Sequence, residues 1–455
     1  MAARSFRGTD GERRWLLGLL MLINLFAYAD RTVVGALGQA IKQDLKLSDM
    51  QLGLLNGFAF AIFYSVLGLP VARMAERRSR VAIIAVATFL WSIMSSLCGV
   101  AQNFTQLLLF RIGVGVGEAG FNPPVASLIG DYCKPGRRAS AMAIVALGGS
   151  FGPAFGAMGG GLIADQGGWR WAFLIIAAPG LILAPLAWFT LREPTRGWAD
   201  GAVHTGEPPS AWATFRYLFA KPAFRNVLIA SALGAFVMNS FGQFTAPLFV
   251  RRFGLSFAAG GFYFGIVSSI AVTAGLLLSG FGSDWASLRD RRWQLWTGAI
   301  GVAIAGPCYV IALRQESPLA LAVALTVALT GLFSYYTPSL ASVQDMAEPR
   351  MRASASFVIS FVTGLIGTGL GPVVTGRISD LLAARAYGGD FASACPGGRA
   401  VAAGVEAARA CSEASATGLG EALMAILLLL PVSALFFFLA GRTLPRDTYS
   451  AGAVA

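Results

Sequence analysis

Four ionisable residues interrupt two apolar stretches in the first third of the chain. Arg111 and Glu118 lie in RIGVGVGE, where the helical period of 3.6 residues places them on one face, two turns apart. Asp30 and Arg31 are adjacent in a second apolar stretch, FAYADRTVV. A charge at bilayer depth is costly unless it faces a partner or water. We therefore expect these two carboxylates and two arginines to gather around a common site.

Such a site could exchange a proton and an anion. A buried carboxylate gains proton affinity when its arginine partner moves away, so Asp30 is the first candidate for a proton carrier and Glu118 the second. Arg31 and Arg111 stay charged and offer a planar fork of donors to a phosphate or carboxylate. Two further polar side chains follow the helical face of Arg31, and these are Asn24 and Tyr28.

A structural explanation of the four charges remains open. Their charges sum to zero, so they could form a salt-bridge network that only joins the first and fourth apolar stretches. Breaking a buried ion pair is costly, so a transport role would include this structural role as well.

The composition is that of a membrane protein. Of 455 residues, 56% are hydrophobic and 13% are charged, against about 25% charged residues in soluble domains. The apolar runs are too long for the strands of an outer-membrane barrel, which leaves helices as the spanning elements. The net charge of +12 arises mostly from basic residues in short loops, so we expect no nucleic-acid partner.

The sequence predicts an all-α polytopic membrane protein with twelve transmembrane helices in two pseudo-symmetric bundles of six. The predicted spans are roughly 15–36, 51–72, 81–101, 105–130, 139–164, 170–191, 223–250, 258–281, 293–313, 318–344, 353–379 and 419–441. The predicted units are a tail at 1–14, a bundle at 15–191, a linker with an amphipathic helix at 192–222, a bundle at 223–441 and a tail at 442–455. The distribution of Lys and Arg predicts that both tails are cytoplasmic, in the inner (plasma) membrane.

The two halves of the chain repeat each other. Residues 123–141 match 337–355 at a constant spacing, which pairs Asp131 with Asp345. Farther along, GLIAD ending at Asp165 matches GRISD ending at Asp380. A duplicated six-helix unit is typical of transporters whose halves rock about a central site.

The chain resembles the major facilitator superfamily over nearly its whole length. The family's signature G-x-x-x-D-R-x-x-R-R/K is resembled in the first half by GLPVARMAERRSR, which has Ala72 where the aspartate is expected. The corresponding segment of the second half, GFGSDWASLRDRR, keeps the aspartate as Asp284. The resemblance implies a cytoplasmic gate formed by Gly68, Arg73 and Asp284. GGSFGPAFG at 148–156 resembles a motif of antiporters, although its small residues would equally serve close helix packing.

Within that superfamily the chain resembles the Spinster-like lipid transporters. The resemblance rests on YADR, RIGVGVGEAGFNPP and GPVVTGRISD. It implies a lipid-like substrate, because this family moves lysophospholipids and sphingoid phosphates in animals. No phosphate-binding loop, metal-ligand spacing or catalytic triad occurs in the sequence, so we expect no cofactor, no metal and no enzyme activity, and an ion gradient as the energy source.

The second half lacks matching charges, and its candidate cavity residues are aromatic, hydroxyl or amide side chains. The candidates from both halves are Asn122, Phe236, Asn239, Gln243, Tyr263, Phe333, Tyr335 and Tyr336. A charged half facing an aromatic half suits an anionic amphiphile. The alternatives are a polyspecific drug/proton antiporter, a small organic-acid symporter and a channel. The expected partners are the substrate, protons and membrane lipids, with the protein acting as a monomer.

Two cysteines lie in the stretch 381–418, which the span assignment makes the longest outer loop. An oxidising compartment there would favour a disulfide between Cys395 and Cys411, pinning the loop over the outer end of the second bundle. The alternative is two free thiols in a loose loop.

Overall fold

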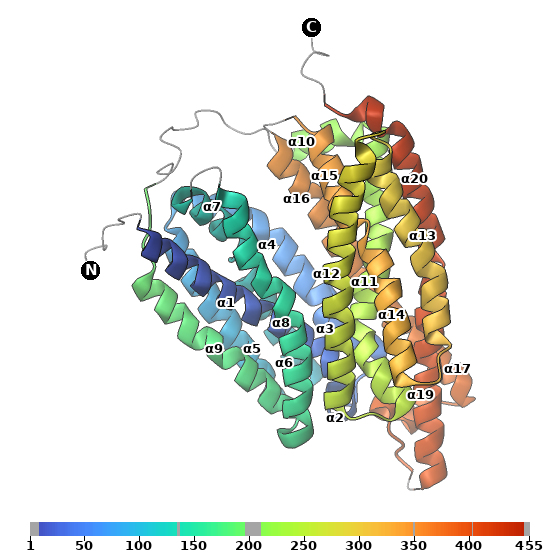
Figure 1. The fold of residues 1–455 in the computed structure, drawn as a ribbon. Helices are drawn as coiled ribbons and strands as arrows, with labels where there is room; N and C mark the ends of the chain where they lie inside the picture. Colours follow the sequence, from blue (N-terminus) through green and yellow to red (C-terminus); the bar gives the residue numbers. More distant parts are fainter. Residues whose placement is uncertain (1–8, 134–136, 196–210, 349–350, 403, 450–455) are drawn as a thin grey trace.

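The computed structural model describes residues 9–133, 137–195, 211–348, 351–402 and 404–449 (Figure 1). All regular structure in these residues is helical. Eleven helical segments of the described residues are long and apolar enough to cross a membrane. Together with the two consecutive helices at 104–132 they form two bundles of six spans, which confirms the predicted fold class. Several spans consist of two or three consecutive helices, because Gly and Pro interrupt them.

The first bundle contains six spans and one short helix. Its spans are α1 (Asp10–Ala36), α3 (Asp49–Asn56) with α4 (Phe58–Arg77), α5 (Arg80–Cys98), α6 (Phe104–Glu118) with α7 (Asn122–Tyr132), α8 (Arg138–Gly167) and α9 (Trp169–Thr190). The short helix α2 (Gly38–Asp44) connects the first two spans. The break between α6 and α7 follows directly after Glu118, so this carboxylate sits at a helix end.

The second bundle follows a linker helix, α10 (Ala211–Phe219), which packs against it. Its spans are α11 (Pro222–Phe253), α12 (Phe257–Ser287), α13 (Trp293–Leu313), α14 (Pro318–Phe333) with α15 (Tyr336–Met346), α16 (Arg352–Thr363) with the π-helix η3 (Gly364–Leu370) and α17 (Gly371–Tyr387), and α19 (Val405–Ile426) with α20 (Leu429–Asp447). A π-helical turn inside a helix is rare and is frequent at functional sites.

The loop that the sequence predicts to lie outside the membrane is shorter than expected. The twelfth span starts at Val405 rather than near 419, because its alanine-rich beginning is helical. Between α17 and α19 lie two short helices, α18 (Phe391–Ala394) and η4 (Pro396–Gly398). Cys395 and Cys411 form a disulfide with their Cα atoms 5.6 Å apart. The loop also reaches the first bundle, because Arg399 donates a hydrogen bond of 2.8 Å to Gln43 on the C-terminal part of α2.

Glycines let α1 and α8 pack closely. A Cβ atom on Gly148 would lie 2.2 Å from the carbonyl oxygen of Met21, and one on Gly156 would lie 2.2 Å from that of Ala29. Any larger side chain would push the helices apart. The GGSFGPAFG segment therefore has a packing role that fixes α1, the helix carrying Asp30 and Arg31.

The two bundles are joined at the end opposite the chain termini, here called the distal end. Asp380 at the distal part of α17 accepts hydrogen bonds from the backbone N–H groups of Asp49 (2.8 Å) and Met50 (2.9 Å) at the start of α3. The side chain of Asp49 in turn bonds to Arg251 on α11 at 2.6 and 2.7 Å. Away from this end the ribbons of the two bundles diverge (Figure 1).

The predicted gate residues lie at the diverging end. Arg73 and Asp284 are exposed, and neither forms an ion pair with another residue in the described part of the chain. A Cβ atom on Gly68 would meet only Phe357, at 3.9 Å. Their role in a gate stays a prediction, to be examined in a conformation closed at this end.

Candidate functional site

The four charged residues of α1 and α6 meet in two crossed ion pairs. Arg111 Nη1 lies 2.8 Å from Asp30 Oδ2. Arg31 Nε donates a hydrogen bond to Glu118 Oε2. The adjacent residues of α1 thus bind different partners on α6, as expected for side chains that diverge by about 100° around a helix.

The Asp30–Arg111 pair is sealed inside the first bundle. Both side chains are 0% exposed. The hydroxyl of Ser95 on α5 donates to Asp30 Oδ1, so both carboxylate oxygens of Asp30 are engaged. Sequence reasoning missed Ser95, because a serine in an apolar helix usually bonds to its own backbone.

The Arg31–Glu118 pair lies at the edge of a cavity. The side chain of Arg31 is 23% exposed, while that of Glu118 is 1% exposed. Glu118 Oε1 is buried and has no hydrogen-bond partner among the described residues. This pair therefore has one accessible cation and one vacant acceptor atom, in contrast to the Asp30–Arg111 pair.

Three aromatic rings surround the Arg31 guanidinium. Its central carbon lies 4.8 Å from the ring centroid of Tyr28 and 4.9 Å from those of Phe60 and Tyr64. Contacts of this length are attractive cation–π interactions. Asn122, a predicted cavity residue, donates a hydrogen bond of 2.8 Å to the Tyr64 hydroxyl. No sequence pattern distinguishes Phe60 and Tyr64, since aromatic residues are common in any apolar span.

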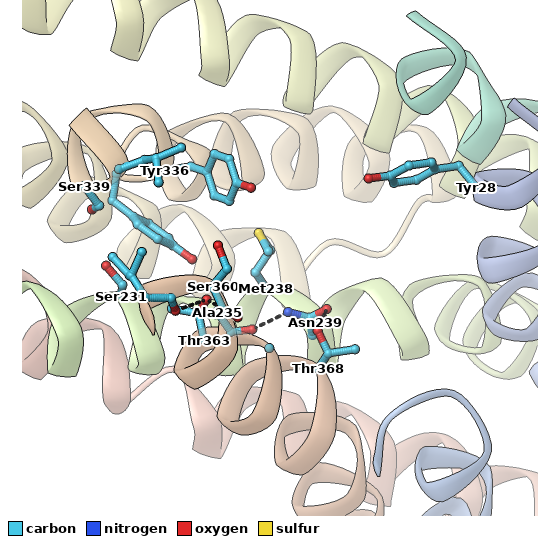
Figure 2. Close-up of a pocket in the computed structure, with 14 residues that line it drawn as sticks. Tyr28, Ser231, Ala235, Met238, Asn239, Tyr336, Ser339, Ser360, Thr363 and Thr368 are labelled. Carbon is cyan, nitrogen blue, oxygen red and sulfur yellow. Dashed lines mark hydrogen bonds between the residues drawn. The ribbon is translucent and has the colours of Figure 1, made fainter. Parts of the chain in front are cut away.

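Two adjoining cavities of about 310 Å³ each lie between the bundles. One contains Arg31 and the aromatic rings beside it. The other runs along α11, α15, α16 and η3, and Tyr28 reaches it from the first bundle (Figure 2). Both cavities are lined by Tyr28, Asn239, Ser360, Gly364 and Thr368. The π-helix η3 thus borders both.

The structure divides the predicted cavity residues into two groups. Those that line a cavity are Tyr28, Arg31, Asn239, Gln243, Tyr335 and Tyr336. The rest contact other parts of the protein: Asn24 donates to the carbonyl of Val145 at 2.9 Å, and Tyr263 stacks on Phe249 with centroids 4.9 Å apart. Phe236 packs against the apolar core, and Phe333 packs against α12 at Gly275.

Hydroxyl side chains of the second bundle were missed by the sequence reasoning. The cavity beside α11 is lined by Ser231, Ser339, Ser360, Thr363 and Thr368 in addition to the predicted residues. Small hydroxyl residues are frequent in membrane helices, so their spacing alone does not reveal a cavity.

Comparison with known proteins agrees with this architecture. Residues 20–372 match the family model of the Major Facilitator Superfamily. An "MFS-type efflux pump" of Mycolicibacterium smegmatis is 33% identical over 82% of this chain and 86% of its own length. The mouse protein named "Sphingosine-1-phosphate transporter SPNS2" is 24% identical over 80% of this chain and 69% of its own length.

Among solved structures, a bacterial homolog of the human lysosomal transporter Spinster, in an inward-facing and unoccupied conformation, is 32% identical. It superposes with a TM-score of 0.89, covering 98% of this chain and 100% of that chain. These matches extend over both bundles, and they describe transporters rather than enzymes. The chain therefore belongs to the major facilitator superfamily, as a Spinster-like transporter.

Proposed function

We propose that this transporter is proton-coupled, works as a monomer by alternating access, and carries an anionic, lipid-like amphiphile such as a lysophospholipid or a sphingoid phosphate. The observation that carries the proposal is the position of Arg31. It is bonded to Glu118 on one side and exposed to a cavity on the other. A ligand anion and Glu118 can therefore compete for the same guanidinium.

Glu118 is the better supported proton carrier, ahead of Asp30. Its Oε1 atom is free to take a proton, whereas both oxygens of Asp30 are already bonded. The charged groups near Glu118 are Arg31, Asp30 and Arg111. Protonation of Glu118 would remove its attraction for Arg31, which stays charged and can then bind a phosphate or carboxylate through its fork of N–H donors.

The surroundings of Arg31 support an amphiphilic substrate. The rings of Tyr28, Phe60 and Tyr64 offer apolar surface next to the cation, which suits an anionic head attached to a hydrocarbon. The similarity to a protein named as a sphingosine-1-phosphate transporter supports the same substrate class.

The distal contacts support alternating access. The bundles are bonded together at the distal end and diverge at the other end (Figure 1). With cytoplasmic termini, as the basic loops predict, this is the inward-facing state. Rocking would break the distal contacts and close the end that carries Arg73 and Asp284.

A second candidate is a drug/proton antiporter. The name of the Mycolicibacterium smegmatis relative, an efflux pump, favours it. Against it stands Arg31, because a cation in the cavity repels the positively charged compounds that many drug pumps carry.

Counterflow in liposomes would test the proposal. Purified protein would be reconstituted with labelled lysophosphatidate, a sphingoid phosphate, a cationic drug and a sugar acid in separate assays, with and without a pH gradient. We expect exchange of the anionic lipids that responds to the gradient in the wild type and not in Glu118→Gln. Exchange of the cationic drug alone would establish the antiporter instead.

A further inference from the structure

The cavity beside α11 contains two buried hydroxyl groups that nothing in the described protein satisfies. Ser231 on α11 and Ser339 on α15 are 1% and 2% exposed. Both residues line the cavity, and their buried Oγ atoms have no hydrogen-bond partner among the described residues. The two serines come from different helices and lie on the same side of the cavity (Figure 2).

Neighbouring hydroxyl groups, in contrast, are hydrogen-bonded to backbone carbonyls. Ser240 on α11 donates to the carbonyl of Phe236 at 2.8 Å, and Ser342 on α15 donates to that of Ser339 at 2.9 Å. Thr363 on α16 donates to the carbonyl of Ile359 at 2.8 Å. A helical hydroxyl normally bonds to its own backbone in this way. A buried hydroxyl without a partner is unfavourable, which points to a partner that arrives with a ligand.

The ligand group that fits here is uncharged. No charged side chain occurs among the described residues that line this cavity. Asn239 could bind a ligand, but its amide is held within the protein: it donates to the carbonyl of Ala235 at 2.8 Å and accepts from Thr368 at 3.1 Å. Hydroxyl groups of Tyr28, Tyr335, Tyr336 and Ser360 also line this cavity. The two serines differ from them because their oxygen atoms are buried without a partner among the described residues, and each can both donate to and accept from a hydroxyl.

We propose that Ser231 and Ser339 bind a hydroxyl group of the substrate backbone, next to an anionic head held at Arg31. This inference rests on the proposed function and specifies its substrate class further: an anionic lipid with a free hydroxyl near the head. The two cavities share five lining residues, so a single molecule can occupy both. The second bundle then recognises the polar backbone of the lipid as well as its hydrocarbon.

A pair of matched ligands tests this role. The probes are a lysophosphatidate with a free hydroxyl on its glycerol and the deoxy analogue that lacks only that hydroxyl. We expect the wild type to bind the hydroxyl form about tenfold more tightly, the factor of roughly one net hydrogen bond. The Ser231→Ala/Ser339→Ala variant should bind both equally, while retaining the wild-type affinity for the deoxy form. Ser342→Ala is the matched control and should keep the preference.

The outcomes separate the two proposals. Equal binding of both probes by the wild type, or a preference that survives in the double variant, would overturn the serine site. If neither probe binds, the lipid assignment fails. The thermal melting temperatures of the ligand-free proteins then test separately whether the two serine hydroxyls lack partners in the protein. Because alanine removes unsatisfied hydroxyls, the double variant should then melt at or above Ser342→Ala. Melting below that control would show that the two hydroxyls have partners in the protein, and would reject the site.

Discussion

Asp165 and Asp380 occupy matching positions in the two halves, and each caps the first turn of a helix in the opposite bundle. Asp165 at the end of α8 accepts from the N–H groups of Phe257 (3.0 Å) and Ala258 (2.9 Å) at the start of α12. Asp380 does the same for α3. A carboxylate at a helix N-terminus bonds orphan N–H groups and interacts favourably with the helix dipole. The repeat thus provides two equivalent contacts that hold the distal end closed.

Replacing both aspartates by asparagine should open the distal end. Asparagine keeps one acceptor oxygen and loses the charge, and a hydrogen bond to a charged group contributes about 1.5–3 kcal/mol. A loss of this size at two sites shifts a two-state equilibrium by at least about tenfold. Spin labels on the exposed residues Gln102 and Glu316, one in each bundle, should report a population with longer distances.

Asp44→Asn is the control for this experiment. Asp44 also lies at the distal end and bonds to Arg170 at 2.6 Å, but both residues belong to the first bundle. Its loss should leave the label distances unchanged. Identical distance distributions for Asp44→Asn and Asp165→Asn/Asp380→Asn would show that the two caps do not control closure.

Glu118→Gln and Asp30→Asn should have different consequences. In the wild type, anion affinity should rise as the pH falls, because protonated Glu118 releases Arg31. Glu118→Gln imitates the protonated form, so its affinity should be high and independent of pH, which titration of binding across the neutral range would measure.

Asp30→Asn instead leaves the Arg111 charge buried without its counter-ion, at a cost of about 3–5 kcal/mol. We expect a lower melting temperature and, in the protein that survives, a pH dependence like that of the wild type. A stable Asp30→Asn protein with pH-independent binding, together with a normal profile for Glu118→Gln, would make Asp30 the carrier.

Lysine substitutions distinguish substrate binding from structure at the two arginines. Arg31→Lys keeps the charge but loses the planar fork, so anion affinity should fall by roughly tenfold with little change in melting temperature. Arg111→Lys should lower the melting temperature and leave affinity intact, because Arg111 is 0% exposed and does not line either cavity. Anion affinity and melting temperature, measured on the same samples, distinguish a substrate-binding role from a structural role for each arginine. Loss of stability in both variants, with normal affinity, would support a purely structural network.

The disulfide should order the distal loop. Mass spectrometry of non-reduced protein is expected to yield a Cys395–Cys411 peptide. In the chain-entropy model, a disulfide that closes a loop of this size stabilises the folded loop by about 3 kcal/mol. Cys395→Ser/Cys411→Ser should therefore exchange amide hydrogens faster in 388–402. The effect should extend to α2, because a Cβ atom on Gly397 would lie only 2.6 Å from the Lys42 carbonyl. Unmodified thiols at both positions, in protein taken from an oxidising compartment, would contradict the bond.

The sequence by itself determined the fold class and the four charged residues that pair between the first and fourth spans. Hydropathy and the helical period are local properties, so twelve spans and the common face of Arg111 and Glu118 follow from neighbouring residues alone. The internal repeat likewise predicted that Asp165 and Asp380 are equivalent. An isolated charge in lipid is costly. That cost was enough to predict that Asp30 and Arg31 would pair with Arg111 and Glu118.

Only the tertiary structure decided how these residues are used. The rotation of α1 against α6 places Arg31 at the cavity and Asp30 in the sealed interior, a difference that adjacent positions in a sequence do not reveal. The approach of α5, α11 and α15 determines that Ser95 is hydrogen-bonded, while Ser231 and Ser339 have no side-chain partner in the part of the chain that the structure describes. Such distinctions depend on the partner that each side chain meets across a helix interface, and that partner lies far away along the chain.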